Sequence, residues 1–246
     1  MKRTGMRASF LVLCAALLTV SACTRHSGAP GVTPRAFGTA LVSVSGEKQF
    51  AGVGSQLEQP LVLQVNDAKG VAVAGALVRL SAAGGAFATP REGLTGPDGQ
   101  FTATITLGGA GGHYQIVASS PTASGQQIFM RVDESALGYQ EMLGAKLNEI
   151  HCIRCHDPES TAERVSNMDN LTAKPHAFTD GAVLNPMSAA DLTSIISHGG
   201  VAVNKSAEMP PYGSMLTKQE IAALVAFLRA VADPPYLAQG VNYASN

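Results

Sequence analysis

Two cysteines and a histidine are grouped in the segment Cys152-Ile153-Arg154-Cys155-His156. Two thiols at this spacing can each add across a vinyl group of one haem, and the histidine that follows directly is then held where its imidazole can bind the iron from one side. The segment therefore predicts one covalently attached haem c, with Cys152 and Cys155 as its thioether links and His156 as the proximal iron ligand.

Two other kinds of site use a C-x-x-C pair. A thioredoxin-type redox pair lies at the strand-to-helix turn of a βαβ unit, and no such pattern surrounds residue 152. A structural zinc site needs four ligands, and the sequence has no second C-x-x-C pair to complete them. Both alternatives are therefore weaker than haem attachment.

A methionine followed by two prolines lies downstream, in the segment Met209-Pro210-Pro211. Each proline fixes φ near about −65° and lacks an N–H group, so the segment should run extended and rigid. Such an arm presents the Met209 thioether in one direction, which suits a sixth ligand to the iron.

Apolar periodicity predicts three helices that would hold these residues. The first begins near Asp133, a suitable N-cap, and presents one buried face up to Ile150. The second ends at Gly199, and the third covers residues 221–231. The segment 157–186 is irregular and must wrap the haem edge. Capping patterns of the Ser/Thr-x-x-acid type stand at Ser160 with Glu163, Ser188 with Asp191, and Thr217 with Glu220.

Residues from about 134 to 235 resemble a mono-haem class I c-type cytochrome domain. The resemblance depends on C-x-x-C-H after a first helix, on the Met-Pro loop, and on a last helix of the form Leu-Thr-x-x-Glu-Ile-x-x-Leu-Val-x-Phe-Leu, which begins here at Leu216. It implies an all-α fold with one haem c and makes Met209 the distal iron ligand. It also implies that Gly144 packs against Phe227 of the last helix.

The chain departs from that family around the proximal ligand. Asp157 replaces the usual glycine after the histidine, and Asn148 replaces an aromatic residue four positions before the first cysteine. The family's Gly-Pro-x-Leu segment, whose proline carbonyl accepts a hydrogen bond from the proximal imidazole, is missing, and Pro175 is the nearest candidate. The alternatives to Met209 as sixth ligand are His176, His198 and Met187.

Residues 1–22 have the pattern of a targeting segment. Three basic residues precede the apolar stretch Phe10 to Val20, which is too short to span a membrane, and small residues then lead to Cys23. This ending resembles the lipobox of bacterial lipoproteins, which implies that Cys23 is lipidated and that residues 24–36 are a flexible tether; a plain secretory signal is the alternative. Thr24 favours the outer membrane of the cell envelope, with the protein facing the periplasm and exposure at the cell surface as an alternative.

Strand periodicity marks residues 37–132. Apolar and polar residues alternate in short runs separated by turn residues, which predicts an antiparallel β-sandwich. The order Val65-Asn-Asp-Ala-Lys-Gly, Val73-Ala-Gly-Ala-Leu-Val, Thr95-Gly-Pro-Asp-Gly-Gln and Gly111-Gly-His-Tyr-Gln-Ile-Val-Ala is similar to bacterial Ig-like domains of the invasin and intimin type. The expected fold is an all-β Ig-like sandwich at 37–132, then an all-α class I cytochrome c fold at 133–235, and a tail at 236–246.

Charge indicates the class of partner. The targeting segment contains three of the 17 basic residues and none of the 18 acidic ones, so the rest of the chain is net acidic and offers no basic patch to a nucleic acid. Between Glu134 and Asp233, 12 acidic residues outnumber seven basic ones. This excess favours redox donor and acceptor proteins with a basic docking face.

Together these features predict a membrane-anchored, periplasm-facing electron-transfer protein and not an enzyme, because two protein ligands leave no open position on the iron. One rival is a haem-based sensor or enzyme subunit whose sixth ligand is displaced by a small molecule. The other is an adhesive or structural lipoprotein in which the Ig-like domain acts and the haem domain is accessory.

Overall fold

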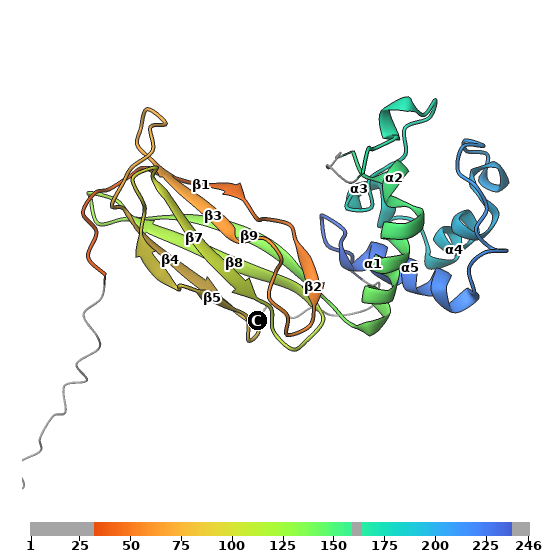
Figure 1. Cartoon of the computed structure of the whole chain (residues 1–246), viewed down its shortest axis with the longest axis horizontal. Helices are drawn as coiled ribbons and strands as arrows, with labels where there is room; N and C mark the ends of the chain where they lie inside the picture. Colours follow the sequence, from red (N-terminus) through yellow and green to blue (C-terminus); the bar gives the residue numbers. More distant parts are fainter. Residues whose placement is uncertain (1–31, 159–163, 238–246) are drawn as a thin grey trace, which may run out of the picture. The chain divides into compact units, whose positions relative to one another are not determined.

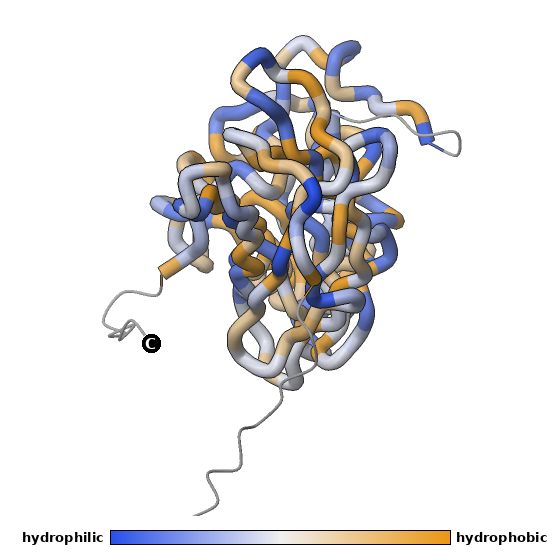
Figure 2. The backbone as a smooth tube through the Cα atoms, turned by 90° about the vertical axis from the view of Figure 1, so that its left-hand side faces the viewer, coloured by the Kyte–Doolittle hydropathy of each residue, from blue (hydrophilic) through white to orange (hydrophobic). Residues whose placement is uncertain are grey.

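The computed structural model describes residues 32–158 and 164–237, and the fold consists of β-sheets followed by helices (Figure 1). The predicted targeting segment, Cys23, and the capping pair at Ser160 and Glu163 lie outside the described residues. Figure 2 shows polar residues interrupting the apolar ones along the chain. In the described part, no helix has the length and apolar character needed to cross a membrane.

The first domain is a β-sandwich of two sheets. One sheet has the strand order β1-β3-β7-β5, and the other has the order β2-β9-β8-β4-β6. The strands are β1 (Ala40–Ser45), β2 (Phe50–Gly52), β3 (Leu61–Asn66), β4 (Leu77–Ala82), β5 (Phe87–Thr89), β6 (Glu92–Leu94), β7 (Gln100–Thr106), β8 (Gly112–Pro121) and β9 (Gln127–Leu137). Most pairs are antiparallel as predicted, but β2 runs parallel to the end of β9.

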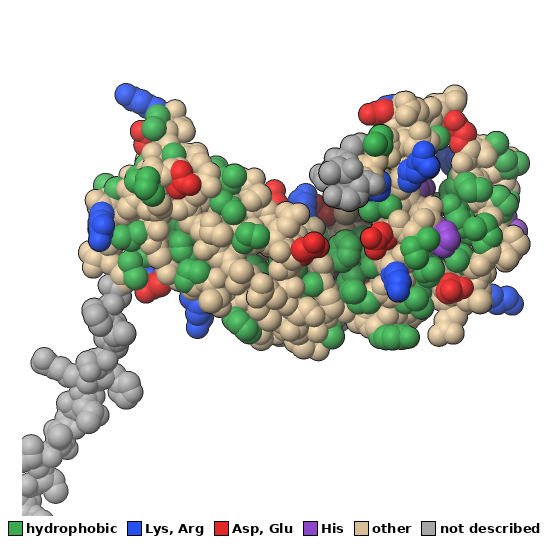
Figure 3. All heavy atoms as spheres, viewed as in Figure 1, with side chains coloured by type: hydrophobic (Ala, Val, Ile, Leu, Met, Phe, Trp, Pro, Cys, Tyr) green, Lys and Arg blue, Asp and Glu red, His purple; other side chains and the backbone are tan. Residues whose placement is uncertain are grey.

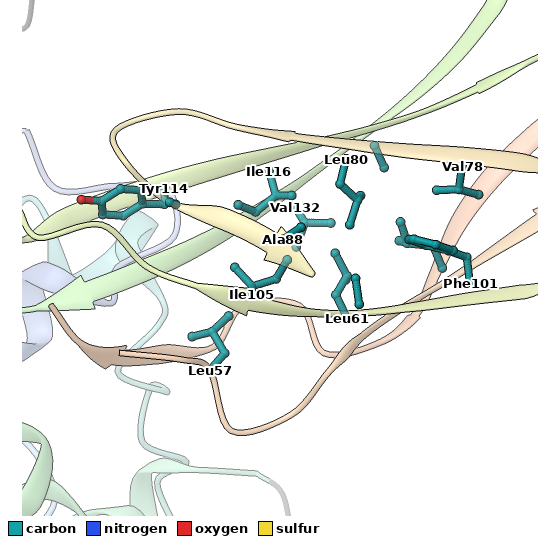
Figure 4. Close-up of a cluster of buried hydrophobic side chains, with 14 of the residues drawn as sticks. Leu57, Leu61, Val78, Leu80, Ala88, Phe101, Ile105, Tyr114, Ile116 and Val132 are labelled. Carbon is teal, nitrogen blue, oxygen red and sulfur yellow. The ribbon is translucent and has the colours of Figure 1, made fainter. Parts of the chain in front are cut away.

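The predicted alternation of apolar residues forms the core of this sandwich. Leu61 and Ile105 from one sheet meet Ile116 and Val132 from the other in a single buried cluster (Figure 4). Successive side chains of a strand point to opposite faces, so each strand supplies every second residue to this core. The all-β sandwich is thereby confirmed, and its burial of large aliphatic side chains is the main stabilising contribution.

The end of β9 differs from the prediction. We expected a helix to begin at Asp133, whereas the strand continues to Leu137 and the helix begins at Tyr139 after an extended Gly138. The strand is prolonged because β8 pairs with it as far as Ala136, and β2 adds a second neighbour. The expected N-cap at Asp133 was therefore wrong, since strand pairing outweighs a local capping pattern.

The second domain is helical, as predicted. Its helices are α1 (Tyr139–His151), α2 (Ile153–His156), η1 (Met168–Asn170), α3 (Gly181–Leu184), α4 (Ala189–His198), η2 (Gly200–Val203) and α5 (Lys218–Ala230). Both capping boxes that fall on described residues are present, at the starts of α4 and α5. Buried leucine and isoleucine side chains of α1, α4 and α5 form one cluster beside the cavity described below.

Candidate haem-binding site

The C-x-x-C-H segment forms a turn of helix directly after α1. The amide of Cys152 donates to Asn148 O at 2.9 Å, and the amides of Cys155 and His156 both donate to Cys152 O at 3.0 Å. Asp157 then leaves the helix in an extended conformation, which any residue can adopt, so the glycine usual in the family is not needed here. Neither cysteine forms a disulfide within the described part of the chain.

A cavity of about 640 Å³ lies in the helical domain. Its lining includes Cys152, Cys155, His156 and Met209, together with apolar side chains of α3, α4 and α5. A volume in the range of about 300–1,000 Å³ is typical of sites for small molecules and cofactors. The structure therefore brings the four predicted haem residues to one largely apolar cavity, and this donor set fits a covalently held haem c.

The His156 imidazole is held in one orientation. His156 Nδ1 lies 2.8 Å from His176 O, and because a carbonyl only accepts, Nδ1 carries the proton and donates. The ring also packs on Phe178, with ring centroids 4.5 Å apart. Burial lowers the pKa of His156, which favours the neutral imidazole. This arrangement leaves Nε2 as the nitrogen available to a metal.

The carbonyl that accepts from His156 belongs to His176, so the candidate Pro175 was wrong. The acceptor is the residue after the proline, and its side chain takes part in another contact, with Nδ1 3.1 Å from Asp180 Oδ2. Every residue type has a backbone carbonyl, so the sequence alone does not identify which one accepts from His156. The nearby proline is its only indication.

The environment of Cys152 does not support the two other C-x-x-C chemistries. Burial, aided by the neighbouring Cys155, raises the pKa of the Cys152 thiol to about 12. Redox-active C-x-x-C pairs have lowered thiol pKa values, so Cys152 lacks their thiolate character. In the described part of the chain, no group of three or more His, Cys, Asp or Glu side chains could hold a metal ion, which gives no support to a zinc site.

The Met209 loop is fixed against the end of α4. Gly200 N donates to Met209 O at 3.1 Å, and Tyr212 N donates to Ile196 O at 3.0 Å. Gly199 permits this approach, because it has φ +76° and a Cβ there would lie 2.7 Å from Met209 O. Sequence predicted Gly199 as a helix end, but not as a contact surface for the loop.

The structure separates the alternative sixth ligands. Met187 and His176 line the same cavity as Met209. His198 is not among the described lining residues, and its Nδ1 lies 3.0 Å from Ser194 O in the preceding helical turn. His198 is thus less well placed than the other candidates to act as the sixth ligand.

Close packing of α1 on α5 sets the position of the C-x-x-C-H segment. A Cβ on Gly144 would lie 2.1 Å from Ala223 O and 2.7 Å from Phe227 Cβ, so the two helices touch where glycine has no side chain. The predicted contact of Gly144 with Phe227 is present. A second link is the hydroxyl of Tyr212, which donates to His151 O at 2.9 Å and joins the Met209 loop to the end of α1.

Known proteins resemble each domain separately. Residues 140–228 match the family described as cytochrome c oxidase, cbb3-type, subunit III. Comparison with curated proteins gives no match. Among solved structures, the D00-D0 domain of intimin is 16% identical, with a TM-score of 0.31 over 43% of this chain and 50% of that one.

Two further solved structures have a similar degree of likeness. The D0-D1 domain of intimin is 20% identical, with a TM-score of 0.32 over 42% of this chain and 49% of that one. The adhesin InvE of Yersinia pseudotuberculosis is 12% identical, with a TM-score of 0.28 over 40% of this chain and 32% of that one. The chain spans about half the length of the two intimin fragments. The helical part of the chain contains a cytochrome c-type domain, which follows a β-sandwich.

Proposed function

We propose that this protein is an electron carrier with one covalent haem c, linked through Cys152 and Cys155 and ligated by His156 and Met209. The observation that supports this most directly is the 2.8 Å contact of His156 Nδ1 with His176 O, within a cavity that both cysteines and Met209 also line. When bound, the haem supplies one-electron chemistry between ferrous and ferric iron.

The chain's own residues have distinct tasks in this proposal. The two thiols hold the cofactor permanently, so it is not lost during repeated electron transfer. The carbonyl of His176 keeps the His156 ring oriented and increases its basicity as a ligand. The Met209 thioether would be the second protein ligand to the iron and would favour a high reduction potential. The apolar lining excludes water, which favours the less charged ferrous state.

The cellular setting is also part of the proposal. Lipidation at Cys23 would anchor the protein to the outer membrane, where it faces the periplasm on a short tether. The excess of acidic residues in the helical domain would attract redox partners with a basic docking face, with an association rate that falls as salt rises. Figure 3 shows acidic and basic side chains interspersed on one face of the molecule. The sandwich would act as a spacer or docking module.

Optical spectra of the haem-loaded protein test the axial ligands. We expect a low-spin haem c with the weak far-red band of methionine bound to ferric iron, and complete loss of this band in Met209→Ala. Met215→Ala is the matched control, because Met215 is 64% exposed and is not among the described residues that line the cavity. It should leave the spectrum unchanged.

Other outcomes would assign the site differently. A bis-histidine spectrum that Met209→Ala does not alter would refute Met209 as the ligand and favour His176. A high-spin spectrum with rapid carbon monoxide binding by the unaltered ferrous protein would replace the electron-carrier proposal with a sensor or enzyme.

A further inference from the structure

The carboxylate of Glu208 joins two loops that are far apart in sequence. Its Oε2 accepts from Thr172 N at 3.0 Å and from Ala173 N at 3.4 Å, while Oε1 lies 3.2 Å from Thr172 N. Both amides lie in a stretch with no helix or strand, so their hydrogen bonds have to come from outside regular structure. Glu208 supplies them.

Ser206 fixes the Glu208 side chain in this position. The Ser206 hydroxyl donates to Glu208 Oε2 at 3.0 Å, and the same oxygen of Ser206 accepts from Glu208 N at 3.1 Å. The carboxylate is thus held by its own loop before it reaches the second one. A side chain held in this way loses less conformational entropy when it forms a bridge.

The two bridged loops support the two proposed iron ligands. Glu208 directly precedes Met209, the proposed distal ligand. Thr172 and Ala173 lead into His176, whose carbonyl accepts from the proximal His156. Residues of both loops line the cavity, including Glu208 itself and Ala173. One carboxylate therefore connects the support of the proximal ligand to the loop of the distal ligand.

The back of the Met209 loop is already fixed, through Gly200 N, Tyr212 N and the Tyr212 hydroxyl. These contacts hold the residues after Met209 and the carbonyl of Met209 itself. The residues before Met209 follow η2 and have Glu208 as their link to the opposite loop. Removing the carboxylate would break the link of this side of the loop to Thr172 and Ala173, while Lys205 N still donates to Gly200 O at 2.8 Å.

We propose that Glu208 is a positioning residue, whose bridge to Thr172 and Ala173 keeps the Met209 thioether in the haem cavity and limits opening of the Met209 loop. This inference rests on the proposed function, because it takes Met209 as the distal ligand. Opening of the loop would expose the sixth position to small exogenous ligands, and their apparent affinity is proportional to the fraction of open molecules.

Imidazole binding to the ferric, haem-loaded full chain measures that fraction. In Glu208→Ala the open fraction should rise, so imidazole should bind about tenfold more tightly than in the unaltered protein. Glu208→Gln keeps one acceptor oxygen for the amides, so its imidazole affinity should lie between those of Glu208→Ala and the unaltered protein. Met209→Ala sets the upper limit, since its sixth position is always open. Glu149→Gln, which alters an exposed glutamate on α1, is the matched control.

Amide hydrogen exchange gives a second readout that does not depend on the iron. The amides of Thr172 and Ala173 should exchange faster in Glu208→Ala, while amides of α5 keep their protection.

Unchanged imidazole affinity in Glu208→Ala, with the far-red band present in the unaltered protein, would overturn the positioning role alone. A missing far-red band in the unaltered protein, with imidazole affinity equal to that of Met209→Ala, would instead overturn Met209 ligation. Loss of amide protection across α5 in Glu208→Ala would also refute the positioning role, by showing that Glu208 only stabilises the domain.

Discussion

Replacing Gly144 by alanine is expected to destabilise the helical domain by about 3 kcal/mol or more. The added Cβ would lie 2.1 Å from Ala223 O and 2.7 Å from Phe227 Cβ, and neither neighbour can move away easily. Ala223 O belongs to the backbone of α5, and Phe227 is 2% exposed. The helices must therefore separate, which disturbs the turn that begins at Cys152.

The direction of the stability change in Gly144→Ala distinguishes the packing contact from helix propensity. Alanine has a higher helix propensity than glycine by about 1 kcal/mol, so an isolated α1 would be stabilised by the change. Chemical denaturation of the haem-loaded chain, followed at the haem absorption band, measures the stability of the helical domain. Gly109→Ala is the control, because among the described residues, its two chain neighbours apart, no atom lies within 4 Å of the added Cβ. A stability in Gly144→Ala equal to or above that of the control would contradict the close contact of α1 with α5.

The arrangement of the C-x-x-C-H segment could be predicted because it is local. Cys152, Cys155 and His156 are fixed relative to one another by a single turn of helix, and sequence spacing alone determines that turn. The strands of the sandwich could be predicted because apolar alternation determines which face of each strand is buried. The capping boxes of α4 and α5 are local in the same way.

Sequence could not predict the supports of the site, because they depend on backbone atoms. The partner of His156 is a carbonyl, and the partners of Glu208 are amides, which every residue type provides equally. The contact of Gly199 with Met209 O needs the position of a loop ten residues away. The end of β9 was missed because Glu134 occupies an inward position, where the alternation pattern leads us to expect an apolar residue.

Glu134 should make the sandwich less stable as pH rises from about 5 to about 8. The side chain is 1% exposed, Oε2 accepts from Gln49 N at 2.6 Å, and Oε1 has no partner among the described residues. Burial raises the pKa of Glu134 to about 8, and the nearby Glu47 and Asp133 carboxylates add to the rise. The folded state therefore holds this proton at pH values where the unfolded chain has lost it.

The sign follows from that difference in proton binding. Below about pH 4 both states are protonated, and the folded state has its full stability; as pH rises towards 8, the unfolded state is favoured by loss of its proton. A carboxyl pKa raised by about 3.5 units corresponds to a cost on the order of 5 kcal/mol above pH 8. Glu134→Gln removes the ionisable group, keeps an acceptor for Gln49 N, and should abolish most of this dependence.

Hydrogen exchange of the β8 and β9 amides, compared between variant and unaltered protein at each pH, measures the effect where it arises. We expect slower exchange in Glu134→Gln than in the unaltered protein at about pH 8 and a small difference at about pH 5. Glu58→Gln, which alters an exposed glutamate of the same sandwich, should match the unaltered protein at both pH values. If the difference at pH 8 is absent, Glu134 is ionised without cost, and its carboxylate must gain a compensating partner, because an unpaired buried charge is strongly destabilising.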